Sequence, residues 1–159
     1  MQKLVKIIVL IGLVSTLICQ KIHAQTSPAP MPVLGVSNPW TEKQVMEPAV
    51  LAAMIDDAKA EKPLLLNIGA VGDIKGAKHI GAVSKAENMQ KLNNAIRDLP
   101  KNTPMVIYCG CCPFSKCPNI RPAFTALQKQ GFTNIKVLDL PVNLKTDWSS
   151  KGYPLAGEK

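Results

Sequence analysis

The segment that decides the fold runs from residue 105 to residue 131 and reads MVIYCGCCPFSKCPNIRPAFTALQKQG. Its first four residues, 105–108, are an apolar run of the length of a buried strand. Apolar residues then recur at the i, i+3, i+4, i+7 spacing of a helix with one buried face: Ile120, Ala123, Phe124 and Leu127. Gly131 supplies a helix stop. A strand, a cysteine-rich loop and a helix therefore follow one another, as they do in sheets of parallel strands.

Strand and helix patterns alternate in the rest of the chain as well. Short apolar runs predict further strands at 64–68, 79–83 and 135–138. Amphipathic spacing predicts helices over 48–58, 84–96 and 119–130, with a short helix or turn around 147–148. The second of these helices begins with Ser84-Lys85-Ala86-Glu87, which has the pattern of a capping box. This alternation predicts an α/β fold: a single domain whose mostly parallel sheet carries helices on both faces.

The N-terminal residues have the layout of a secretory signal peptide. Lys3 and Lys6 precede an apolar run over 7–19, and a short polar tail ends at Ala24. A run of this length is shorter than the roughly 20 residues that a membrane-spanning helix needs. We therefore expect a signal peptide over 1–24, export to the periplasm or the extracellular space, and no stable membrane insertion after cleavage. A flexible linker rich in Pro and Ser is expected over 25–39, and the domain over 40–159.

The charge pattern argues against a nucleic-acid partner. The chain carries a formal net charge of +8, but its lysines are scattered and aromatic residues make up only 4% of the sequence. A nucleic-acid surface usually combines a basic stripe with stacking aromatics. We interpret the basic residues as a solvated surface that favours small anions.

The cysteines are concentrated in one loop. Four of the five lie within nine residues: Cys109, Cys111, Cys112 and Cys117. A disulfide framework of an exported protein would instead join distant segments. These four can only constrain or equip the loop that follows the strand at 105–108. In a parallel sheet that loop lies beyond the carboxyl ends of the strands, where ligands bind.

Four stretches, in order, resemble the rhodanese family. The family's active-site segment resembles 105–132, with its strand ending in Tyr-Cys, its loop and its helix. Lys78-His79-Ile80-Gly81-Ala82 is similar to the family's His-Ile-Pro-Gly-Ala segment, and 65–69 occupies the place of its Leu-Ile-Asp-Val-Arg strand. Trp148 with Gly152-Tyr153-Pro154 resembles the family's C-terminal ending. The resemblance extends from about residue 40 to residue 154.

The resemblance implies sulfur transfer through a cysteine persulfide, without a cofactor. Cys109 matches the catalytic cysteine, which takes a sulfane sulfur from a small anionic donor such as thiosulfate and passes it to a thiol acceptor. The active-site loop that this implies comprises Gly110, Cys111, Cys112, Ser115, Lys116, Cys117 and Arg121. Asn67 and Gly69 stand where the family has aspartate and arginine, so the match is incomplete.

Physical chemistry independently favours a thiolate in this loop. The thiolate is the reactive form of cysteine and needs stabilisation near neutral pH. Loop N–H groups and the start of the helix at 119–130 would stabilise an anion. We therefore expect the Cys109 sulfur to face that helix's first amides and to reach solvent. Lys116 and Arg121 would add positive charge for the donor.

Two other uses of the cysteines remain open. As a metal site, Cys109, Cys111, Cys112 and Cys117 would hold Cu(I) or Zn(II), because soft thiolates select these ions. Adjacent cysteines cannot easily both bind one tetrahedral zinc, so copper fits better. As a redox or structural loop, the same cysteines would form disulfides, for example between 109 and 112 or between 111 and 117. Either use makes the protein a non-catalytic module of the same fold.

Overall fold

The computed structural model describes residues 37–157. The signal peptide predicted over 1–24 and most of the linker predicted over 25–39 lie outside the described residues. The strands are β1 (Val45–Met46), β2 (Leu64–Asn67), β3 (Lys78–His79), β4 (Met105–Tyr108) and β5 (Ile135–Leu138). The α-helices are α2 (Pro48–Asp56), α3 (Ala86–Ile96), α4 (Ile120–Lys129) and α5 (Leu144–Asp147). Short 3-10 turns are η1 (Glu42–Gln44), η2 (Phe114–Lys116) and η3 (Ser149–Lys151).

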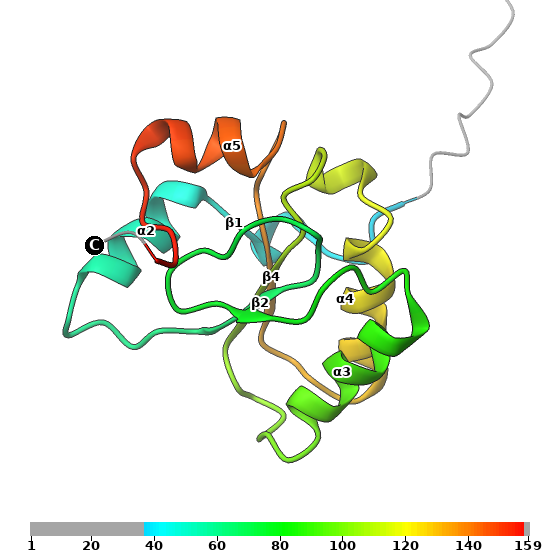
Figure 1. Ribbon diagram of the computed structural model, residues 1–159. Helices are drawn as coiled ribbons and strands as arrows, with labels where there is room; N and C mark the ends of the chain where they lie inside the picture. Colours follow the sequence, from blue (N-terminus) through cyan, green and yellow to red (C-terminus); the bar gives the residue numbers. More distant parts are fainter. Residues whose placement is uncertain (1–36, 158–159) are drawn as a thin grey trace, which may run out of the picture. The chain divides into compact units, whose positions relative to one another are not determined.

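The five strands form one parallel sheet in the order β1-β5-β4-β2-β3. The strand at 105–108 is central: Met105 pairs with Leu64 of β2 on one side and with Ile135 of β5 on the other. Helices cover both faces, with α3 and α4 on one side and α2 and α5 on the other (Figure 1). The predicted α/β fold with a parallel sheet is confirmed.

Alternation along β4 sends its side chains into two separate cores. Met105, Ile107 and Cys109 join the cluster under α3 and α4, whereas Val106 and Tyr108 join the cluster under α2 and α5. All five are at most 1% exposed, and burial of each apolar side chain contributes roughly 1.5–3 kcal/mol. The same alternation decides which way the site cysteine points, because Cys109 continues it beyond the end of the strand.

The strand predicted over 79–83 is shorter and begins earlier than expected. Only Lys78–His79 pairs with β2, and both residues are exposed. The chain then leaves the sheet at Gly81, which has a positive φ of 88°. A side chain there would also crowd Asn88, 2.8 Å from the added Cβ. Ile80 and Val83 are nevertheless buried, so the apolar residues that suggested a strand pack from an irregular segment.

The capping box predicted at Ser84 is wrong. Helix α3 begins at Ala86, its N-cap is Lys85, and no side chain caps it. Ser84 instead donates its backbone N–H to Asn119 Oδ1 at 2.9 Å, which ties this turn to the start of α4. A tertiary hydrogen bond therefore replaces the local pattern that the sequence suggested.

Among residues 37–157, every helix is too short or too polar to span a bilayer.

Candidate cysteine centre

Cys109 follows β4 at the carboxyl end of the sheet, where it lies against Gly69 at the end of β2. A Cβ atom at residue 69 would come within 2.2 Å of the Cys109 carbonyl oxygen and 2.7 Å of its Sγ. No side chain fits in that space. Because Gly69 has no side chain, the end of β2 can approach the Cys109 backbone and sulfur this closely.

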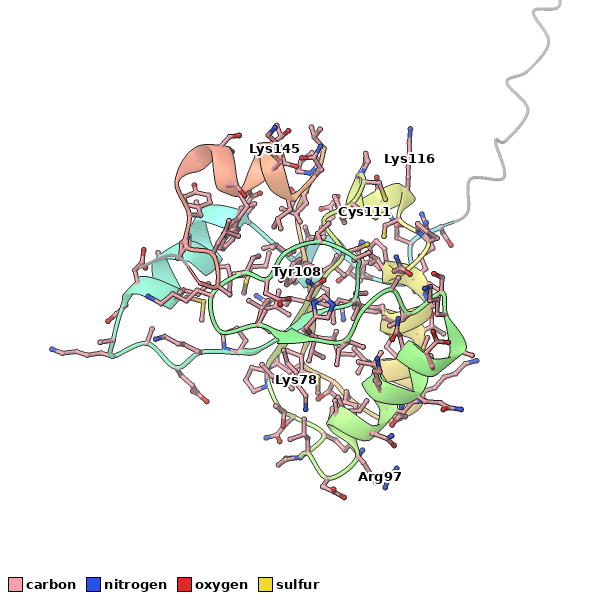
Figure 2. All side chains as sticks on the ribbon, in the orientation of Figure 1. Lys78, Arg97, Tyr108, Cys111, Lys116 and Lys145 are labelled. Carbon is pink, nitrogen blue, oxygen red and sulfur yellow. The ribbon has the colours of Figure 1, made fainter. Side chains whose placement is uncertain are left out.

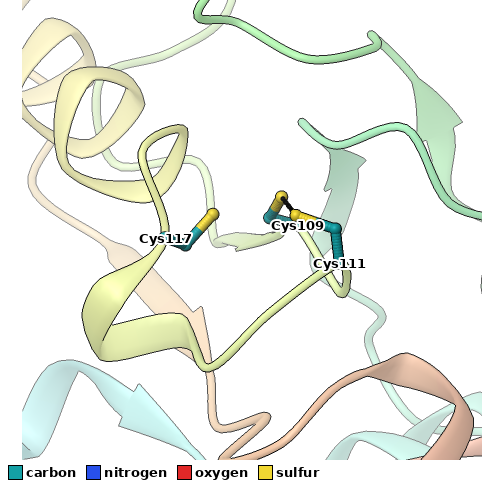
Figure 3. A group of neighbouring side chains, drawn as sticks. All are labelled: Cys109, Cys111 and Cys117. Carbon is teal, nitrogen blue, oxygen red and sulfur yellow. Dashed lines mark hydrogen bonds between the residues drawn. The ribbon is translucent and has the colours of Figure 1, made fainter.

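Gly110 turns the chain so that the next cysteine comes back over Cys109. Its φ is +71°, in the left-handed region that favours glycine. A Cβ there would also lie 2.8 Å from the Cβ of Leu144 in α5. The Leu144 backbone N–H donates to the Gly110 carbonyl at 2.9 Å, which fixes the turn. As a result, the Sγ of Cys111 lies 3.1 Å from the Sγ of Cys109 (Figure 3).

The third member of the cluster is Cys117, directly after η2. Its sulfur points toward the other two in Figure 3, and the three Sγ atoms lie within 4.8 Å of one another. The backbone N–H of Asn119, at the start of α4, donates to Cys117 Sγ at 3.5 Å. The first helix amide therefore faces Cys117. The prediction that it would face Cys109 is wrong, because the turn at η2 inserts Cys117 between them.

The helix start reaches Cys109 through a side chain instead. The Asn119 Nδ2 donates to Cys109 Sγ at 3.2 Å, while its Oδ1 accepts from the Ser84 backbone. Sequence analysis missed Asn119 as a site residue. Its position was a signal, because Asn119 begins the helix predicted over 119–130 and asparagine is a preferred N-cap residue. In the structure its side chain does not cap α4 but bonds to Ser84 and Cys109.

Access to the cluster differs sharply between its members. Cys109 is 1% exposed and Cys117 0%, whereas Cys111 is exposed. The prediction that the Cys109 side chain reaches solvent is wrong, because β4 directs it inward beneath α4 and Cys111 lies against its sulfur. Cys112 is half-buried, with its Sγ 3.5 Å from that of Cys111 and outside the three-sulfur cluster.

The hydrogen bonds of the cluster concentrate negative charge on Cys109. The pKa of Cys109 falls to about 5. The Cys117 thiol lowers this pKa most, and the Cys111 thiol and the Asn119 amide lower it further, whereas burial of Cys109 raises it. Burial, followed by the hydrogen bond to Cys109, raises the pKa of Cys111 to about 12. Donation to Cys109, together with burial, also raises the pKa of Cys117. The directions of these three shifts favour Cys109 as the thiolate of the cluster.

All four loop cysteines are free, and neither suggested disulfide is formed. The close pair is Cys109 with Cys111, whose sulfurs lie well beyond the bonded distance of about 2.05 Å. In the described residues the cysteines of the cluster are therefore reduced.

The charged residues expected to attract a donor lie away from the sulfurs. The Lys116 side chain is exposed and extends outward from η2 (Figure 2). Arg121 donates through Nη2 to Asn38 Oδ1 at 2.7 Å and to the Ser115 carbonyl, with its guanidinium 5.8 Å from the Trp40 ring. Arg121 thus ties the loop to the segment before β1.

An open depression of about 650 Å³ lies beside the exposed cysteine, and its lining includes Val71, Asp73, Gly110, Cys111, Asn143 and Lys145. One wall is the loop after β2. Asn67, buried at the end of β2, holds this loop in place through side-chain hydrogen bonds. The Asn67 side chain donates to the Val71 carbonyl at 2.9 Å and to Asp73 Oδ1 at 2.8 Å. Of the loop cysteines, Cys111 meets this space.

Comparison with known proteins supports the fold. No family model matches the chain, and no curated protein matches it. Among solved structures, wild-type EanB matches with a TM-score of 0.50 and 16% identity over 70% of this chain. A cysteine-to-serine variant of EanB with hercynine gives 0.51 and 17%. A variant with two cysteine-to-alanine changes, also with hercynine, gives 0.50 and 16%. This chain covers only 27% of the EanB chain, and a likeness at this identity shows a shared α/β fold.

Proposed function

We propose that the protein is a rhodanese-like sulfurtransferase, which moves sulfane sulfur through a cysteine persulfide in the loop 109–117. The observation that carries the proposal is the 3.1 Å separation between the Sγ of buried Cys109 and that of exposed Cys111. The position beyond the carboxyl end of a central parallel strand supports it, since such sheets bind ligands there. The hercynine complexes of EanB further support a small-molecule site in this fold.

In the first step Cys111 meets the donor from the depression that it lines. Its thiol proton passes to the Cys109 thiolate, and the Cys111 sulfur attacks the outer sulfur of thiosulfate. The new S–S bond forms a Cys111 persulfide anion, the S–S bond of thiosulfate breaks, and sulfite leaves with that bond's electron pair. Cys109 is the proton acceptor because it is the thiolate of the pair; since its pKa is about 5 and that of Cys111 about 12, the proton transfer is uphill and is coupled to formation of the new S–S bond.

In the second step the outer sulfur moves inward. Cys109 loses its proton to the departing Cys111 sulfur and attacks the outer sulfur of the persulfide. The products are a Cys111 thiol and a Cys109 persulfide anion, so atoms and charge balance. Burial then protects the persulfide from water. The Asn119 side-chain amide, which lies 3.2 Å from Cys109 Sγ in the structure, provides a hydrogen-bond donor. Reversal of both steps delivers the sulfur to a thiol or cyanide acceptor.

A cyanide assay tests the proposal. Thiosulfate and cyanide should yield thiocyanate and sulfite, and Cys109→Ser and Cys111→Ser should each lower turnover by roughly 10²-fold or more. Cys112→Ser is the matched control, because Cys112 lies next to Cys111 but outside the cluster, and it should keep turnover within about threefold. Failure of the parent protein with thiosulfate, organic persulfides and polysulfide, or full turnover in either serine variant, would overturn the proposal.

The predicted signal peptide gives the proposal a location. We propose that the reaction takes place outside the cytoplasm, in the periplasm or the extracellular space. Fractionation of cells that express the full chain, with immunoblotting for the processed form, tests this independently of activity. Recovery of an unprocessed protein from the cytoplasm alone would contradict it.

A further inference from the structure

The three-sulfur cluster has the dimensions of a metal site. The Sγ atoms of Cys109, Cys111 and Cys117 lie within 4.8 Å of one another, and the shortest separation is 3.1 Å. In a trigonal site with metal–sulfur bonds of about 2.3 Å, the sulfurs are about 4 Å apart. The observed separations bracket this value, so side-chain adjustments of about 1 Å would close the cluster around one ion.

We propose that Cys109, Cys111 and Cys117 bind a single Cu(I) ion in a three-sulfur site. Each cysteine binds as a thiolate, any proton still on its sulfur passes to solvent as the sulfur–copper bond forms, and neither sulfur nor copper changes oxidation state. Thiolate ligands select soft ions and exclude Mg²⁺ and Ca²⁺. This inference goes beyond sulfur transfer, because bound copper occupies the same sulfurs and would block it.

The number of ligands distinguishes Cu(I) from Zn(II). Structural zinc sites are almost always four-coordinate. Within residues 37–157, the group of possible ligands contains three cysteines and no histidine or carboxylate. Cys112, the fourth ligand that the sequence offered, lies outside the group. A site with three thiolates therefore suits Cu(I), which accepts three sulfur ligands, better than Zn(II), which would lack its fourth ligand.

The surroundings suit a cluster with net negative charge. Three thiolates around one monovalent cation leave excess negative charge, which burial would otherwise disfavour. The Asn119 backbone N–H faces Cys117 and the Asn119 side-chain amide faces Cys109, so both buried sulfurs keep a donor when deprotonated. The exposed Cys111 gives the ion an entry path from the depression.

A Cu(I) titration under anaerobic, reducing conditions tests the proposal. The full chain carries Cys19→Ser in every variant, so that only loop thiols remain. Competition with a chromophoric Cu(I) chelator should give one copper per chain, and X-ray absorption at the copper edge should count three sulfur neighbours. Cys111→Ser and Cys117→Ser should each weaken binding by roughly 10²-fold or more, whereas Cys112→Ser should stay within about threefold.

Several results would overturn the copper site. They are a coordination number of two sulfurs, a stoichiometry other than one, or equal losses in the 112 and 117 variants. Circular dichroism checks the fold of each variant, and Cys111→Ser keeps the test available if the buried Cys117→Ser does not fold. The titration measures binding alone, so it stands apart from the thiocyanate assay, and either proposal can fail without the other.

Discussion

A Cβ atom placed on Gly69 would lie 2.7 Å from the Sγ of Cys109 and still closer to its carbonyl oxygen. The end of β2 therefore limits the space in which the site sulfur can lie. Gly69, after β2, thus limits the position of the Cys109 sulfur, after the neighbouring strand β4. A side chain of any size at position 69 would therefore collide with this cysteine.

The change Gly69→Ala tests the contact directly. We expect a loss of unfolding free energy of about 1–3 kcal/mol, because the backbone of Cys109 must move to accept a methyl group. Gly72→Ala is the matched control: a Cβ there meets nothing within 4 Å. Urea denaturation of both variants measures the difference. Equal stability of the two variants would contradict the close approach of β2 and β4.

The change Asn119→Asp tests the hydrogen bond that reaches Cys109 from α4. The carboxylate keeps an acceptor for the Ser84 N–H but replaces the donor at 3.2 Å with negative charge. We expect the pKa of Cys109 to rise by about one to three units. Ultraviolet thiolate absorbance against pH, with Cys109→Ser for assignment, gives the shift. The exposed Asn102→Asp should leave the titration unchanged. An unchanged titration in Asn119→Asp would contradict the assigned donor.

The pKa of Cys109 also predicts how stability depends on pH. The fold holds this pKa at about 5, below the ordinary thiol value of about 8.5. A lowered pKa contributes stability that is present above the ordinary value and is lost as the pH falls toward 5. The stability of the parent protein relative to Cys109→Ser should therefore decline between about pH 8.5 and pH 5. Denaturation curves at both ends of this window measure it, and a constant difference would contradict the lowered pKa.

The hydroxyl of Tyr108 supports the loop that lines the depression. The Ile74 backbone N–H donates to Tyr108 Oη at 2.9 Å in the core under α2 and α5. Tyr108→Phe leaves this buried N–H without a partner, so we expect a loss of about 1–3 kcal/mol in unfolding free energy. Amide hydrogen exchange at Ile74 should also accelerate. Tyr153→Phe keeps the ring that packs against Trp148 and should change stability by less than about 0.5 kcal/mol. Equal effects of the two changes would contradict the role of Tyr108.

Hydrophobic periodicity was sufficient to predict the architecture. The apolar pattern predicted β4 and α4 correctly because the residues that form it are the ones that the two elements bury. They are residues 105–108 in the strand and Ile120, Ala123, Phe124 and Leu127 in the helix. The failures occur where tertiary contacts override a local pattern. Ser84 has the residue type of an N-cap, but its backbone bonds to Asn119 instead.

The cysteine loop could be located from the sequence but not built from it. Its position after β4 followed from the strand–loop–helix order. Which sulfur meets the helix amides depends on the left-handed turn at Gly110 and on η2, and neither has a periodic signature. For the same reason, sequence alone did not separate Cys112 from the three clustered cysteines.

Intact mass spectrometry after brief incubation with thiosulfate tests the paired action of Cys109 and Cys111 most directly. With Cys19 replaced by serine throughout, the parent and Cys112→Ser chains should each gain one sulfur atom, removable by cyanide. Cys109→Ser and Cys111→Ser should gain none that persists. A parent chain that never acquires sulfur, or a serine variant at 109 or 111 that acquires it as fully as the parent, would contradict the account.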